Sequence, residues 1–235
     1  MRYPPFSPCR FFALTSVLTL VAMPVVGGSQ ITPSSSGYLF RHKFRAGQTS
    51  KFVVTVKSTN KAMPNPVITL IPITAKVVSV TNKTAKLSVT VGPMTLAGRT
   101  QGKPSTTEIE VEDSGPKGKE AMMTYMEYGD LYVPFVRTPI RIGQSFPIKR
   151  EGEWPLLGRV TVAANYTFSG FTTVAGKKAA RFTMSATKQA RVDSTIAGAV
   201  LISMDDGSTL SIDQTTTVKM PAGGITTQQL TAQRQ

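Results

Sequence analysis

Thr84-Ala85-Lys86-Leu87-Ser88-Val89-Thr90-Val91 is the stretch that decides the fold class, because polar and apolar side chains alternate along all of it. Successive side chains of a β-strand point to opposite faces, so this period of two predicts a strand with one buried face. Similar alternation recurs at residues 51–57, 159–168 and 180–186. Past residue 30 the nearest helix candidate is 120–132, where Gly129 and three tyrosines argue against a helix. The sequence therefore predicts an all-β or mainly β protein.

Turn signals separate these strands. Asn82-Lys83, Ala175-Gly176-Lys177 and Asp205-Asp206-Gly207-Ser208 lie between alternating runs. Asn and Gly adopt the positive φ angles of tight hairpins at little cost. Consecutive strands are therefore expected to pair antiparallel, in one or more curved sheets.

A short pattern occurs twice, as Phe44-Arg45-Ala46-Gly47-Gln48 and Ile140-Arg141-Ile142-Gly143-Gln144. Each copy is followed at a similar distance by Ala-(Lys/Arg)-apolar, at Ala85 and at Ala180. Either the β-rich domain, residues 29–220, contains two related halves at 37–98 and 122–220, or the match is chance similarity between β-rich segments. The polar residues 99–121 are predicted to form a linker with a short strand at 108–112, and residues 221–235 a flexible tail.

The N-terminus has the order of a secretory signal. Residues 1–10 contain Arg2 and Arg10 and no acidic residue. An apolar run of about 16 residues follows, which is shorter than the roughly 20 residues that a helix needs to cross a bilayer. Small residues at 26–29 predict cleavage after Gly28, and the alternative is an uncleaved membrane anchor. Cys9, the only cysteine, would leave with the signal. We expect a secreted or periplasmic protein with neither a disulfide nor a membrane span after cleavage.

The chain is strongly basic. It has 27 Lys and Arg against 13 Asp and Glu, a net charge of +14, and loss of the signal's two arginines leaves 25 − 13, or +12. Such a surplus attracts polyanions. The cations are scattered rather than clustered with aromatic residues, which disfavours specific nucleic-acid binding. General surface charge and affinity for anionic envelope polymers both remain open.

Catalytic residues are scarce. His42 is the only histidine, and its neighbours Arg41 and Lys43 predict an exposed strand position. A Gly-x-Ser-x-Gly elbow is absent from the sequence, and the part after the signal has no thiol, so nucleophilic hydrolysis is disfavoured. The sequence predicts a protein that is not an enzyme.

Acidic residues offer two weaker alternatives. Asp205, Asp206 and Asp213 are expected in and after a hairpin turn rather than around a metal, since they do not match the spacing of a calcium loop. Glu151 and Glu153 precede Trp154, an arrangement that suits a sugar-binding hydrolase or, as we prefer, a turn with solvated acids. No metal or cofactor is predicted.

Three segments carry a resemblance: residues 38–48, residues 139–146, and residues 166–182 with Val174-Ala175-Gly176-Lys177. Their pattern of glycine and alternating apolar residues resembles exported bacterial β-rich proteins that form a family of unknown function. It is distantly similar to the half-barrel of periplasmic lipoprotein carriers. The resemblance implies a half-barrel or open barrel-like sheet with an apolar ligand on its concave face. Such a face would include Val160, Val162, Tyr166, Phe168, Phe182 and Met184, which otherwise form a core.

The leading hypothesis is a non-enzymatic envelope protein that binds or scaffolds through a sheet face. One alternative is a carrier of lipid or another apolar ligand in a half-barrel groove. Another is adhesion to an anionic cell-surface polymer. The sequence itself does not distinguish among them.

Overall fold

The computed structural model describes residues 31–60, 63–117, 131–154, 158–190, 192–219 and 224–235. Within them every regular element is a strand. The strands are β1 (Ile31–Ser34), β2 (Gly37–Phe40), β3 (Thr49–Asn60), β4 (Met63–Thr81), β5 (Thr84–Val91), β6 (Met94–Leu96), β7 (Arg99–Gln101), β8 (Ser105–Glu112), β9 (Gly115–Lys117), β10 (Ser145–Trp154), β11 (Gly158–Val174), β12 (Lys177–Gln189), β13 (Ser194–Ser203), β14 (Thr209–Lys219) and β15 (Ile225–Arg234). The predicted fold class is confirmed.

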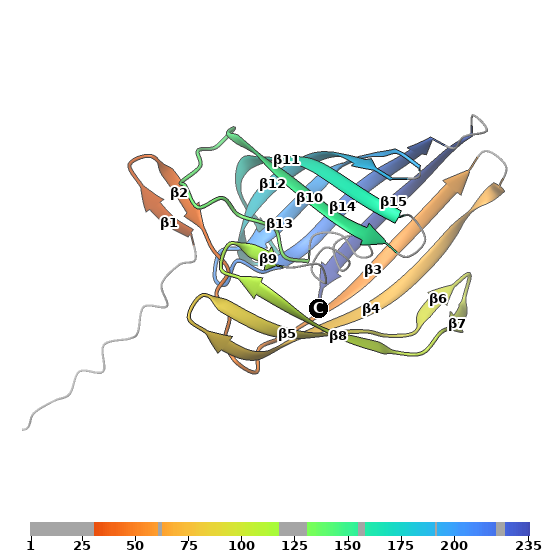
Figure 1. The fold of residues 1–235 in the computed structure, drawn as a ribbon, viewed down its shortest axis with the longest axis horizontal. Coiled ribbons are helices and arrows are strands. Elements are labelled where there is room, and N and C mark those ends of the chain that lie inside the picture. Colours follow the sequence, from red (N-terminus) through yellow and green to blue (C-terminus); the bar gives the residue numbers. More distant parts are fainter. Residues whose placement is uncertain (1–30, 61–62, 118–130, 155–157, 191, 220–223) are drawn as a thin grey trace, which may run out of the picture.

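Thirteen strands form one antiparallel sheet in the order β10-β11-β12-β13-β14-β15-β3-β4-β5-β8-β9, with β6 paired to β4 and β7 paired to β6. The sheet curves strongly, and Figure 1 shows its two ends on opposite sides of a common interior. Strands β10 and β9 end the order without pairing to each other, so the sheet is not closed into a barrel. Strands β1 and β2 form a separate hairpin at one end of this interior.

The alternating sequences produce the expected half-buried strands. In β5 the side chains of Ala85, Leu87 and Val89 are buried, and those between them are more exposed. Strand β11 shows the same alternation from Val160 to Phe168. We call the face that carries these buried side chains the inner face of the sheet. The predicted turns also form, with positive φ at Asn82, at Ala175 and Gly176, and at Gly207.

The repeated Gly-Gln pattern makes the same turn twice. Before β3, Gln48 N donates to Arg45 O (3.0 Å) and Arg45 N donates to the Gln48 side chain (3.1 Å). Before β10, Gln144 N donates to Arg141 O (3.0 Å) and Arg141 N to the Gln144 side chain (2.9 Å). The glycine before each glutamine has a φ near +80°, which favours glycine. Two segments far apart in sequence thus start a strand with the same local structure.

Two boundary predictions need correction. The expected linker 99–121 is, as far as residue 117, part of the main sheet, where β8 extends the short strand predicted at 108–112. The expected flexible tail 221–235 contains β15, which pairs with β14 on one side and β3 on the other. Hydrogen bonding along both edges stabilises a strand whose side chains are mostly polar. The predicted signal, residues 1–28, lies outside the described residues.

The aromatic part of the apolar core fills one end of the interior. Phe40, Phe135, Phe168 and Phe182 pack there, with ring centroids 4.9–6.1 Å apart for the contacting pairs. The loop at 131–140 closes this end and is tied to β2 by a bridge between Tyr38 and Ile140. In addition, Arg41 donates from its guanidinium to the carbonyl oxygens of Val136 (2.8 Å) and Arg137 (3.1 Å). We call this end of the interior the closed end.

Candidate functional site

The inner face of the sheet changes character along its strands. On β3, Phe52 and Val54 are buried, whereas Val56 and Ser58 are only half-buried. The antiparallel neighbour β4 changes one inward residue nearer the closed end, from buried Ile73 to half-buried Ile71. On β14, buried Ile212 and Gln214 are followed by half-buried Thr216 and Val218. On these three strands the inner face is therefore sealed at the closed end and accessible toward the opposite rim, whereas on β11 it stays buried as far as Val160.

Five apolar side chains lie where this change occurs. Each is half-buried, points to the inner face and packs against the core cluster. We call them the inner belt: Val56, Ile71, Ile148, Ile196 and Leu230. Leu230 and Val56 are direct cross-strand partners on β15 and β3. The belt therefore offers apolar surface that the protein does not fully cover.

The six residues expected as a ligand face are all buried, four of them deeper than the belt and two of them, Val160 and Val162, at the rim end of β11. Their side chains are 0–3% exposed and all belong to the core cluster: Val160, Val162, Tyr166, Phe168, Phe182 and Met184. At these positions the structure shows a packed core. The accessible apolar surface is contributed mainly by other strands, β3, β4, β13 and β15.

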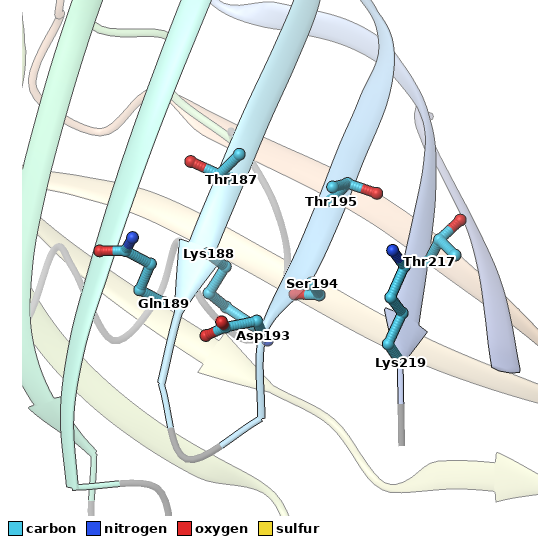
Figure 2. A pocket seen from close by; sticks show the side chains of 8 residues that line it. All are labelled: Thr187, Lys188, Gln189, Asp193, Ser194, Thr195, Thr217 and Lys219. Atoms are coloured by element: carbon cyan, nitrogen blue, oxygen red, sulfur yellow. The ribbon is translucent and has the colours of Figure 1, made fainter. Parts of the chain in front are cut away.

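A cavity of about 320 Å³ lies at the rim, where β12, β13 and β14 end (Figure 2). Lys188 of β12 and Ser194 of β13 are cross-strand partners on the inner face, one step beyond Ala186 and Ile196. The outer face of the same strands contributes three hydroxyls, an amide and the second lysine. The lining residues are Thr187, Lys188, Gln189, Asp193, Ser194, Thr195, Thr217 and Lys219. We call this cavity the rim pocket.

The Ser194 hydroxyl is unusual in the rim pocket. Ser194 is 5% exposed, and its Oγ makes no hydrogen bond with any residue in the described part of the chain. Leaving a buried hydroxyl without a partner costs about 1–3 kcal/mol. Such groups are rare in folded proteins and need an explanation.

Two lysines give the rim pocket its charge. Partial burial lowers the pKa of the Lys188 ammonium, since desolvation disfavours the charged form. Neither Lys188 nor Lys219 forms an ion pair among the residues whose positions the structure describes. Asp193 is the one acid in the lining, and it accepts a 3.4 Å hydrogen bond from Ala190 N in the hairpin turn. The lining thus carries one net positive charge.

The prediction that His42 is exposed is wrong. Its side chain is 4% exposed, and its ring Nε2 donates to Val133 O at 2.9 Å. The rings of Phe44, Tyr132 and Phe135 surround it, with centroid distances of 4.7–5.7 Å. Burial lowers its pKa to about 4. A neutral, enclosed imidazole of this kind is poorly placed to exchange protons with a substrate.

Asp206 lies beside this histidine in the β13–β14 turn. Its carboxylate accepts hydrogen bonds from Ser208 N (3.0 Å), Ser208 Oγ (2.6 Å) and Gln48 Nε2 (2.9 Å), and it pairs with Arg234 at 3.4 Å. Burial by itself would raise the pKa of Asp206, but the two hydrogen bonds from Ser208 and the Arg234 charge lower it. Asp206 therefore joins the turn to the N-terminal segment and to β15. Asp205, its neighbour, is exposed, as is Asp213.

Glu151 and Glu153 are on edge strand β10 rather than in a turn, which corrects that prediction. Glu151 pairs with Lys149 at 2.8 Å and with Arg159 at 2.7 Å, and the hydrogen bonds from these cations lower its pKa to about 2. A glycosidase acid needs a raised pKa, so this pairing does not favour that role. The side chain of Trp154 lies outside the described part of the structure.

In the described ranges, no three His, Asp or Glu side chains gather where they could hold a metal ion. A separate finding concerns membranes: the described residues include no helix that is long and apolar enough to cross a bilayer.

The rim pocket was not predicted from the sequence, although the alternation along β12 and β13 marks its position. The inward alternation Phe182, Met184, Ala186 continues to Lys188, and Ser194 precedes Ile196 in the same phase. A polar residue that continues the inward phase of a strand marks the place where the core ends. No protein-family model matches this chain, and a search of curated proteins finds no similar sequence.

Proposed function

We propose that this chain is an exported, non-enzymatic binding protein that holds an acyl chain or a similarly apolar ligand against the inner belt. The observation that carries the proposal is the half-burial of Val56, Ile71 and Leu230 on the inner face of a sheet that does not close. Apolar surface of this kind gains about 25 cal/mol per Å² when a ligand covers it. Small-ligand sites are typically concave and mostly apolar in this way.

The side chains best suited to acid–base catalysis, His42 and Glu151, are both held in ways that favour a binding role over catalysis. The one histidine of the chain is enclosed by aromatic rings, and Glu151 is held by two cations. Export rests on the N-terminal sequence, where two arginines and an apolar run precede the small residues at 26–29.

The proposal is tested with N-phenyl-1-naphthylamine, a neutral apolar dye that becomes fluorescent when it leaves water. We expect saturable binding by the wild-type protein. Leu230→Asn should weaken binding about tenfold or more, because a polar amide replaces a belt side chain. Thr231→Asn is the matched control, since the neighbouring residue of β15 points to the outer face, and it should leave binding unchanged.

Circular dichroism of each variant must show the native sheet signal before the binding constants are compared. Absence of saturable binding by the wild type would overturn the proposal. Equal weakening by Leu230→Asn and Thr231→Asn would also do so, because binding would then not involve the inner face.

A further inference from the structure

Two residues of the rim pocket, Lys188 and Ser194, continue the inner face on which the belt lies. Ser194 lies two residues before Ile196 on β13, and Lys188 lies two residues after Ala186 on β12. All four side chains belong to the inner face of the sheet. Residues two apart on one strand are about 7 Å apart on the same face. A ligand whose apolar part covers Ile196 therefore has its end group next to Ser194 and Lys188.

The polar atoms in this pocket suit an anion. Ser194 supplies a buried hydroxyl that has no partner among the described residues and that can donate a hydrogen bond. Lys188 supplies an ammonium that is half-buried and forms no ion pair within the described ranges. Figure 2 shows the Ser194 oxygen on the side facing Lys188 and Asp193, with Lys219 at the end of the neighbouring strand.

Burial also leaves Lys188 in need of a counter-charge. Desolvation lowers the pKa of its ammonium, and a bound anion would raise that pKa again. The single Asp193 carboxylate does not neutralise two lysines, so one positive charge remains for a ligand. Thr187, Thr195 and Thr217 line the pocket from the outer face, so Lys188 and Ser194 are the donors on the side of the belt.

We propose that the rim pocket is an anion site in which Lys188 and Ser194 bind the carboxylate or phosphate head group of an acyl-chain ligand. This inference rests on the proposed function, because it assigns the apolar part of the same ligand to the inner belt. The ligand class is therefore a single-chain anionic amphiphile.

The test measures displacement of N-phenyl-1-naphthylamine by three probes with the same chain: dodecanoate, dodecyl phosphate and dodecan-1-ol. In the wild type, we expect at least one anionic probe to displace the dye at about a tenfold lower concentration than the alcohol. Lys188→Gln should remove this preference and leave displacement by dodecan-1-ol unchanged. Ser194→Ala should reduce the preference severalfold.

Lys57→Gln is the matched control for charge, because Lys57 is an exposed lysine in the outward phase of β3. It should keep the full preference for the anionic probes. A preference for dodecanoate alone or for dodecyl phosphate alone supports the anion site and identifies the head group.

Equal displacement by all three probes in the wild type would overturn the anion site and leave the proposed function standing. Retention of the preference in Lys188→Gln, or its equal loss in Lys57→Gln, would also overturn it. Failure of the dye and dodecan-1-ol to bind at all would instead show that the proposed function itself is wrong, and the anion site would fall with it.

Discussion

His42 shows how a single residue can make the protein sensitive to acid. Its ring lies among Phe44, Tyr132 and Phe135, and burial lowers its pKa to about 4 from the ordinary 6.5. The folded protein therefore resists protonation at a pH where the unfolded chain accepts it. His42 is the only histidine, and carboxylates have ordinary pKa values near 4, so His42 dominates the upper part of this window.

We expect the free energy of unfolding to fall as the pH is lowered from about 6.5 toward 4. The unfolded state binds more protons than the folded state in this window, so His42 contributes full stability above pH 6.5 and loses about 3 kcal/mol of it by pH 4. Urea denaturation at several pH values measures this dependence. His42→Gln keeps a side-chain donor but does not titrate, and it should flatten the curve. An unchanged pH dependence in His42→Gln would contradict the assignment.

At the scale of elements, turns and well-patterned strands could be predicted from sequence. Strand β5 was expected at the residues where it occurs, because its inward side chains are apolar and its outward ones polar. The turn at Asn82 was predictable because asparagine tolerates the positive φ that the hairpin requires. These features depend on local sequence alone.

The strand β15 could not be predicted in this way. Its inward positions include Thr226, Gln228 and Arg234, so the alternation of polar and apolar residues is weak. This segment forms a strand because it pairs with β14 and β3, and the sequence of residues 225–234 alone does not reveal either partner. The burial of His42 was missed for the same reason, since the rings around it come partly from residues 132 and 135.

Because β15 is paired on both edges, a proline within it should disrupt the fold. We expect Gln229→Pro to destabilise the protein by about 3 kcal/mol or more, because proline removes a backbone donor and does not fit a central strand. Gln229→Ala, at the same exposed position, should change stability by no more than about 0.5 kcal/mol. Thermal denaturation followed by circular dichroism compares the two. Similar melting temperatures for both variants would show that β15 does not pair as described.

For the molecule as a whole, a single core connects the two repeated turns and the strands that follow them. One cluster of buried residues includes Phe52 and Leu87 from the first part of the chain and Phe168 and Phe182 from the second. Sequence suggested two halves because the Gly-Gln turns recur, and it could not show that the strands after them share one sheet. That arrangement depends on the central position of β15.

A shared core should make unfolding cooperative across the described sheet. We expect differential scanning calorimetry to show one transition, with a ratio of calorimetric to van't Hoff enthalpy of about one. The two segments would melt separately only if few contacts joined them. Two resolved transitions, or a ratio well above one, would contradict the single core.

The central position of β15 also has a consequence for the order of folding. A hydrogen bond from Thr59 to the Thr227 carbonyl joins residues 168 positions apart, so β3 lacks its second neighbour until the C-terminal residues have been synthesised. Pairs so distant in sequence form slowly, because closing a long loop costs conformational entropy before the stabilising contacts between its ends can form. The ribosome must therefore release the residues of β15 before the sheet can be completed. The polar strand β15 therefore joins the two parts of the sheet, and its synthesis limits when the sheet can be completed.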